Sequence, residues 1–307
     1  MKIVLLLFCT FFVSQVAWSE EPQVVVTIKP IHSLVAGVMQ GVAEPQLLIK
    51  GGGSPHGYVL RPSEARALAK ADLIVWVGDS LESFLEKPLS SLGRNARQLE
   101  LMTVLAPLLL PIRAGGSWEG HAHEVEMVQE HQAHAGQQLN PHLWLSPKLA
   151  KQVVEVTATV LSEIDPPHQG AYRKNAERLF ERLKQLDERL RAELAPVSEV
   201  PYLVFHDAYQ YFEAVYHLNA VGSVTIDAER KPGIKRLLEM RDKIRRLNAR
   251  CVFSEPQFEP KLVATIIEGT GARTGVLDPL GAKLSPGPES YFQLLDALAD
   301  NLVRGLR

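Results

Sequence analysis

Residues 24–28 read VVVTI and are followed by LLI at 47–49, PSEARALAK at 62–70 and LIVWV at 73–77. The short runs rich in β-branched residues are typical of strands, and the segment 62–70, which opens on proline, is typical of a helix. Strands that alternate with helices favour a mostly parallel sheet covered by helices. The sequence therefore predicts an α/β fold for this part of the chain.

The second half of the chain restarts the same alternation. Strand-like runs lie at 202–205, 220–224, 251–254 and 275–277, and helix-like segments follow Asp207, Pro232, Pro260 and Pro288. The two halves share this rhythm but no residue-level repeat. We expect an N-terminal lobe over 20–164 and a C-terminal lobe over 196–307.

A long helical segment lies between these lobes, within 165–195. Leucines recur in it at spacings of three or four, at Leu179, Leu183, Leu186, Leu190 and Leu194. The opposite face is rich in Arg, Lys and Glu, so the pattern predicts one amphipathic helix. At about 1.5 Å per residue it would run roughly 40 Å, enough to link two lobes. An ordinary surface helix is the alternative.

The first 19 residues have the pattern of an export signal. Lys2 is followed by an apolar run over 3–13 and by the small-residue site AWS at 17–19. We expect cleavage before Glu20 and export of the mature chain. The apolar run is too short for a membrane span, and no other candidate span is evident. Cys9 lies inside this run, too early for a lipid anchor.

Composition excludes several classes of protein. A formal net charge of −2 and scattered aromatic residues give no basis for binding nucleic acid or an anionic membrane. After signal removal Cys251 is the sole cysteine, so an intramolecular disulfide is impossible. Its setting predicts the start of a buried strand, and a thiol metal ligand is the weaker alternative.

Four possible metal ligands lie at predicted loop or strand ends, two in each half. They are His56 in SPHGY (54–58), His142 in NPHLW (140–144), His206 in FHDAY (205–209) and Asp278 in LDPLG (277–281). Three imidazoles and one carboxylate suit a first-row transition ion, zinc above all. Each has a structural alternative, such as a loop histidine or a turn aspartate. Asp207 could cap the following helix or hold the His206 imidazole.

A polar segment over 114–138 interrupts the alternation and lacks a periodic apolar face. It contains His121, His123, His131 and His134 among glutamates and glutamines. We expect a flexible loop that either collects metal weakly or serves as a spacer. His32, His168 and His217 are assigned structural roles.

Several motifs, taken together, resemble those of a known family. They are GSPHGYVLRPS (53–63), NPHLWLSP (140–147), FHDAYQYF (205–212), EPQF (255–258) and LDPLG (277–281). They are similar to the ZnuA-type periplasmic zinc-binding proteins, the metal-binding (cluster A-I, cluster 9) components of bacterial ABC importers. The resemblance extends over essentially the whole mature chain.

This resemblance implies two lobes, each with a mostly parallel four-stranded sheet, joined by one long rigid helix. It implies Zn²⁺ held in the cleft by His56, His142 and His206. Manganese-binding relatives have a carboxylate at the third position, so His206 favours zinc, with Asp278 or water as the fourth ligand. The expected partner is a zinc ABC permease in the inner membrane, with a periplasmic zinc chaperone as a further candidate. The resemblance implies a periplasmic monomer that is not an enzyme.

The chain departs from the family pattern at three places. Pro55 stands where some members have a glutamate, the disulfide partner of Cys251 is missing, and the histidine loop is sparse. A secreted zinc hydrolase is one alternative, although neither His-Glu-x-x-His nor Gly-x-Ser-x-Gly occurs. A manganese-type receptor or adhesin is another, and it would need a carboxylate at position 206.

Overall fold

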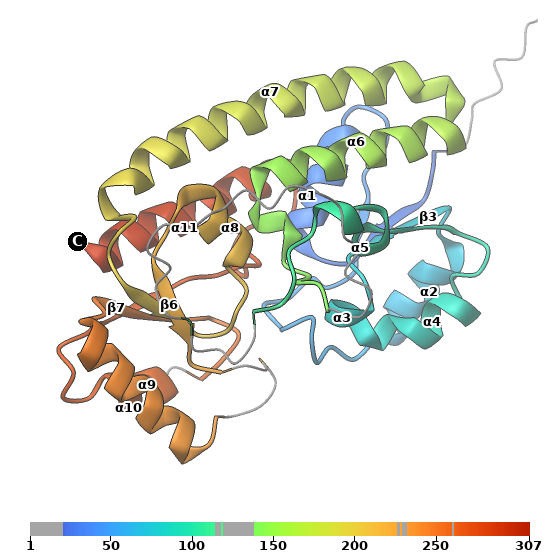
Figure 1. Cartoon of the computed structure of the whole chain (residues 1–307). Helices are drawn as coiled ribbons and strands as arrows, with labels where there is room; N and C mark the ends of the chain where they lie inside the picture. The colour runs from blue at the N-terminus through green and yellow to red at the C-terminus, as the bar shows by residue number, and fades with distance from the viewer. Residues whose placement is uncertain (1–20, 114–117, 119–137, 226–227, 229–231, 260) are drawn as a thin grey trace, which may run out of the picture.

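The computed structural model describes residues 21–113, 118, 138–225, 228, 232–259 and 261–307 (Figure 1). The predicted export signal lies outside these residues. So do the loop histidines His121, His123, His131 and His134. Among the helices of the described residues, none combines the length and the apolar character that a membrane crossing requires.

The N-terminal half contains a parallel four-stranded sheet in the order β2-β1-β3-β4. Its strands are β1 (Val24–Val26), β2 (Gln46–Leu47), β3 (Leu73–Trp76) and β4 (Arg97–Glu100). Strand β4 does not follow from the sequence pattern, because its residues RQLE are mostly polar. This strand lies at the edge of the sheet, where polar side chains can face solvent.

Short helices surround this sheet. They are α1 (Lys29–Val38), α2 (Pro62–Lys70), α3 (Asp79–Glu82), η1 (Ser83–Leu85), α4 (Glu86–Ser91), α5 (Leu101–Val104) and η2 (Ala106–Leu108). Helix α2 has the predicted bounds, because Pro62 opens it and the carboxylate of Glu64 accepts the free backbone N–H of Arg61 at 2.8 Å.

The C-terminal half repeats the sheet topology, in the order β6-β5-β7-β8. Its strands are β5 (Tyr202–Val204), β6 (Ala220–Ser223), β7 (Cys251–Ser254) and β8 (Arg273–Val276), and its helices are α8 (Gln210–Tyr216), α9 (Ile234–Leu247), α10 (Lys261–Ile267) and α11 (Ser290–Leu306). The predicted α/β fold with two parallel sheets is confirmed.

Helices η4 (Leu143–Leu145), α6 (Pro147–Ile164), η5 (Pro166–His168), α7 (Gln169–Leu194) and η6 (Ala195–Val197) connect the halves. Helix α7 has 26 residues. It runs beside both halves (Figure 1). It packs on α1 and α6 at one end and on α8 and α11 at the other. The predicted leucine stripe is buried against them, since none of its five leucines is more than 2% exposed.

Each sheet buries its two faces in different cores, because side chains alternate along a strand. Val26 of β1 and Val204 of β5 belong to one shared core, which also contains the leucine stripe of α7. Val25 packs instead into a core confined to the N-terminal half, and Leu203 into one confined to the C-terminal half. The shared core therefore joins the two halves over more than a single connecting helix.

Cys251 begins β7 and is fully buried, as predicted for a strand residue. Burial raises the pKa of its thiol to about 12, so the thiolate is not formed at neutral pH. Among the described residues Cys251 does not belong to the group that could hold a metal.

The contribution of α7 to the shared core can be tested by truncating one leucine of its buried stripe. We expect Leu186→Ala to lower the free energy of unfolding by about 2–5 kcal/mol, because Leu186 is 0% exposed and its truncation leaves a cavity. The exposed Glu188 on the same helix provides the control, and Glu188→Ala should change stability by less than about 0.5 kcal/mol. Denaturant unfolding measures both, and equal effects would contradict the packing described here.

Candidate metal centre

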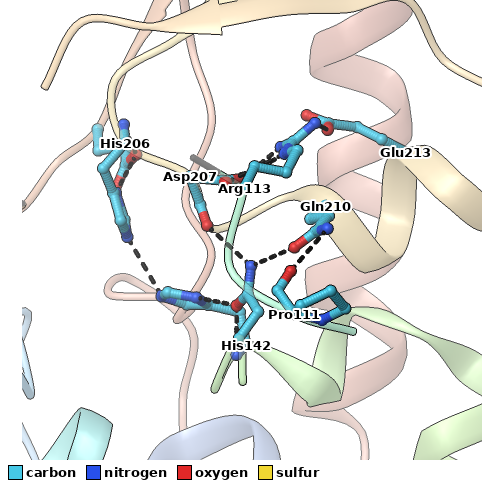
Figure 2. Close-up of polar contacts among 9 residues, drawn as sticks. Pro111, Arg113, His142, His206, Asp207, Gln210 and Glu213 are labelled. Carbon is cyan, nitrogen blue, oxygen red and sulfur yellow. Dashed lines mark hydrogen bonds and ion pairs between the residues drawn. The ribbon is translucent and has the colours of Figure 1, made fainter. Parts of the chain in front are cut away.

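Three of the predicted ligands converge. The ligand atoms of His56, His142 and His206 all lie within 4.8 Å of one another. The ring centroids are 5.5 Å apart for His56 and His142, 5.8 Å for His56 and His206, and 5.1 Å for His142 and His206. Figure 2 shows His142 and His206 facing each other. Their Nε2 atoms lie 3.2 Å apart. The arrangement is suited to coordination of one cation.

The three histidines reach this point from different parts of the fold. His56 lies in the loop between β2 and α2, His142 directly precedes η4, and His206 lies just beyond β5. In open α/β sheets, loops beyond the carboxyl ends of the strands form the ligand crevice. The site therefore takes ligands from both halves of the molecule.

A small cavity adjoins the three imidazoles. Its other walls include Pro55, Trp144, Glu255, Phe258, Pro279 and Leu280. Its volume is about 10 Å³, which is roughly the space that one water molecule occupies. The dimensions suit a single ion.

Asn140 orients His142. Its Oδ1 accepts hydrogen bonds from the backbone N–H of His142 at 3.0 Å and from the ring Nδ1 at 2.8 Å. Its Nδ2 donates to Gln210 Oε1 at 2.8 Å and to the carbonyl oxygen of Asp207 at 3.3 Å, so the amide has only one consistent orientation. Since Nδ1 of His142 must carry the proton, the lone pair of Nε2 faces the cavity.

Glu255 has the same effect on His206. Its Oε1 accepts from Nδ1 of His206 at 2.7 Å and from the backbone N–H at 3.3 Å. Asp207, which the sequence offers for this role or for capping a helix, has neither role, so both interpretations are wrong. The side chain of Asp207 binds Arg113 instead, and the N-cap of α8 is Tyr209. The position of EPQF directly after strand 251–254 could have indicated Glu255, because β7 pairs with β5.

The site favours neutral imidazole. Burial, reinforced by the neighbouring His206 and His56, holds the pKa of His142 well below its usual value. A histidine with a lowered pKa keeps its lone pair available at neutral pH, which a metal ligand requires.

Asp278 does not belong to the group of three histidines. It lies in the turn after β8, where Oδ1 accepts from the backbone N–H groups of Leu280 and Gly281 at 3.1 and 3.0 Å, and Oδ2 from that of Ala282 at 2.6 Å. Oδ1 also accepts from Gln257 Nε2 at 2.9 Å. These contacts are those of a turn aspartate, which was the structural alternative to a metal ligand at this position. Whether Asp278 ligates a metal stays a prediction.

The remaining described histidines have structural roles, as expected. Nε2 of His32 lies 2.9 Å from the carbonyl oxygen of Pro45, and Nδ1 of His168 lies 2.8 Å from Asp165 Oδ2. His217 ends α8 in a left-handed conformation at φ 53°.

A cluster of charges fixes the chain beyond His206. Arg113 binds the carboxylate of Asp207, and its Nη1 lies 2.8 Å from Oε2 of the buried Glu213 (Figure 2). The guanidinium also stacks on the Trp118 ring, 3.5 Å from its centroid. Burial raises the pKa of Glu213 to about 7, although the charge of Arg113 opposes this rise.

Comparisons with known proteins identify close relatives. Residues 24–305 match the family model described as "Zinc-uptake complex component A periplasmic" (ZnuA). The high-affinity zinc uptake system protein ZnuA of Brucella abortus (strain 2308) is 44% identical over 304 residues, covering 92% of this chain and 91% of that protein. The protein of the same name from Yersinia pestis is 35% identical over 289 residues, covering 92% and 91%.

The fold also matches a solved structure described as the crystal structure of ZnuA. The TM-score is 0.77 at 24% sequence identity, and the match covers 94% of this chain and 100% of that one. At this level of identity the similarity shows that the fold is shared.

The charge cluster predicts a pH-dependent loss of stability. The folded-state pKa of Glu213 lies above its unfolded value of about 4.3, so the stability that its protonated form contributes is fully present below about pH 4.3 and is lost as pH rises to about 7. We therefore expect Arg113→Gln to cost about 3–5 kcal/mol at pH 8, where Glu213 is ionised, and less at pH 5.5.

Denaturant unfolding at the two pH values measures this difference. Arg97→Gln is the control, because its partner Glu163 and Arg97 itself are 57% and 61% exposed, and the change should cost less than about 1 kcal/mol at both. A pH-independent cost of Arg113→Gln would contradict the assignment.

Proposed function

We propose, since the chain belongs to the ZnuA family of periplasmic zinc-uptake components, that it captures Zn²⁺ and delivers it to a membrane ABC permease for high-affinity zinc uptake. The observation that carries the proposal is the convergence of three buried or half-buried imidazoles on a cavity of about 10 Å³. The ion is the transported substrate.

The chemistry of the donor set supports zinc. Imidazole nitrogens suit Zn²⁺, whereas manganese and magnesium prefer oxygen ligands. In our proposal His56, His142 and His206 are the three protein ligands. A fourth position is taken by Asp278 or by water, and the four hydrogen bonds already accepted by the Asp278 carboxylate favour water.

A binding protein fits this site better than a hydrolase does. Catalytic zinc also has three protein ligands, but it needs space for a substrate beside the ion. The cavity that Trp144, Pro279 and Leu280 line beside the imidazoles has a volume of about 10 Å³, which suits an ion better than a substrate. Zinc-dependent turnover of ester or peptide substrates would revive the hydrolase alternative. A manganese-type receptor or adhesin is disfavoured by the histidine at position 206.

We further propose that the protein acts in the periplasm as a monomer after removal of residues 1–19. The permease would receive the ion from the mouth of the site between the two halves. A periplasmic zinc chaperone remains a candidate second partner. Pull-down of the permease by the zinc-loaded chain, compared with the zinc-free chain, tests the interaction with the permease.

The ligand assignment is tested by substitution. The wild-type chain without residues 1–19 should bind one tightly held Zn²⁺, and His56→Ala, His142→Ala and His206→Ala should each weaken it by more than about 100-fold, since even a partner of a ligand is worth 10–100-fold. Metal analysis after dialysis and chelator competition give stoichiometry and affinity. His168→Ala, away from the site, should bind as the wild type does. Undiminished binding in all three variants would exclude this site.

The loop histidines form a separate proposal, in which they collect zinc weakly and pass it to the main site. We expect joint replacement of His121, His123, His131 and His134 by alanine to remove weak sites and to leave the tight site intact, because none of these residues is proposed as its ligand. Isothermal titration at excess zinc resolves the two classes. Loss of the tight site would contradict the proposal, and unchanged weak binding would leave the loop as a spacer.

A further inference from the structure

We infer that Glu255 supplies the compensating negative charge of the metal centre through the imidazole of His206, and so sets how tightly the site holds a divalent cation. The inference rests on the proposed function of the same site. It assigns to Glu255 a role in affinity that is distinct from supporting the fold.

The sheet places this carboxylate against the ligand. Strands β5 and β7 are neighbours, with Tyr202 opposite Cys251, so the residues that follow both strands meet at the same rim. Glu255 follows β7 and is 3% exposed, and it forms part of the cavity wall. Its Oε1 lies 2.7 Å from Nδ1 of His206, whereas Nε2 of the same ring faces His142.

In the described residues, no lysine or arginine forms an ion pair with the Glu255 carboxylate. Within the described part of the chain, the only ion-pair partner within 4.0 Å of its carboxylate is His206. The buried Glu213, by contrast, pairs with Arg113. A buried carboxylate without a cationic partner is costly, and a divalent ion on Nε2 of the same imidazole offsets that cost. The ion and the carboxylate therefore stabilise each other across one ring.

The other buried ligand provides an internal comparison. His142 makes the corresponding contact to Asn140, whose amide is neutral and is held by Gln210. Both partners fix the tautomer, but only Glu255 adds charge, so it makes His206 the stronger donor. The difference in donor strength between His206 and His142 therefore arises from Glu255, the residue directly after β7.

The test is Glu255→Gln in the full mature chain. Glutamine keeps the size of the side chain and an oxygen that accepts from His206, but it removes the charge. We expect the dissociation constant for Zn²⁺ to rise about 10–100-fold. The melting temperature of the zinc-free protein should stay unchanged or rise, because a neutral amide is buried more easily than a carboxylate. The rise in melting temperature on adding zinc should shrink accordingly.

Two further measurements make the result specific. The visible absorption of the Co²⁺-substituted variant should shift, since the donor strength of His206 changes. Glu82→Gln is the matched control: Glu82 is 0% exposed and accepts from the backbone N–H groups of Val77 and Gly78, but it contacts none of the three ligands. Its zinc affinity and cobalt spectrum should equal those of the wild type.

The outcomes separate the possibilities. Wild-type zinc affinity in Glu255→Gln would show that the carboxylate only orients the ring, and it would overturn the inference. Weaker binding together with a less stable zinc-free protein would indicate a structural role and would overturn it too. A wild-type chain that binds no zinc would overturn the proposed function itself.

Discussion

The structure depends on bringing imidazole nitrogens from two separate halves of the chain to one point. The Nε2 atoms of His142 and His206 lie 3.2 Å apart although the residues are 64 positions apart in sequence. With both Nδ1 atoms donating to their partners, two lone pairs face each other across this gap, an arrangement that a shared cation stabilises. The halves must therefore be held in a fixed relation, and much of the surrounding structure has this effect.

Polar contacts around the site hold the halves together. Trp144 Nε1 donates to the carbonyl oxygen of Pro279 at 2.7 Å, and the buried Lys29 donates to that of Gly281 at 2.6 Å. The hydroxyl of Tyr291 donates in turn to the carbonyl oxygen of Trp144 at 2.9 Å. These bonds position the turn that contains Asp278 against the N-terminal half. Since that turn forms one wall of the cavity, they also define its size.

The shared apolar core has a related consequence for movement. Inward-facing residues of both sheets, such as Val26 and Val204, pack into one core with the leucine stripe of α7. A wide hinge motion would expose this core to water, at a cost that grows with the apolar area exposed. Binding and release of an ion through local changes in loops at the rim are more consistent with this construction than is opening of the whole molecule.

The alternation of strands and helices, the buried stripe of α7 and the choice of the three histidines as candidate ligands can be predicted from the sequence, because each depends on local pattern. The sequence pattern missed β4, whose polar RQLE segment is a strand only through pairing with β3. It assigned the support of His206 to its neighbour Asp207, whereas Glu255, remote in sequence, provides it. Which side chains meet depends on strand order and register, and only the tertiary structure decides these.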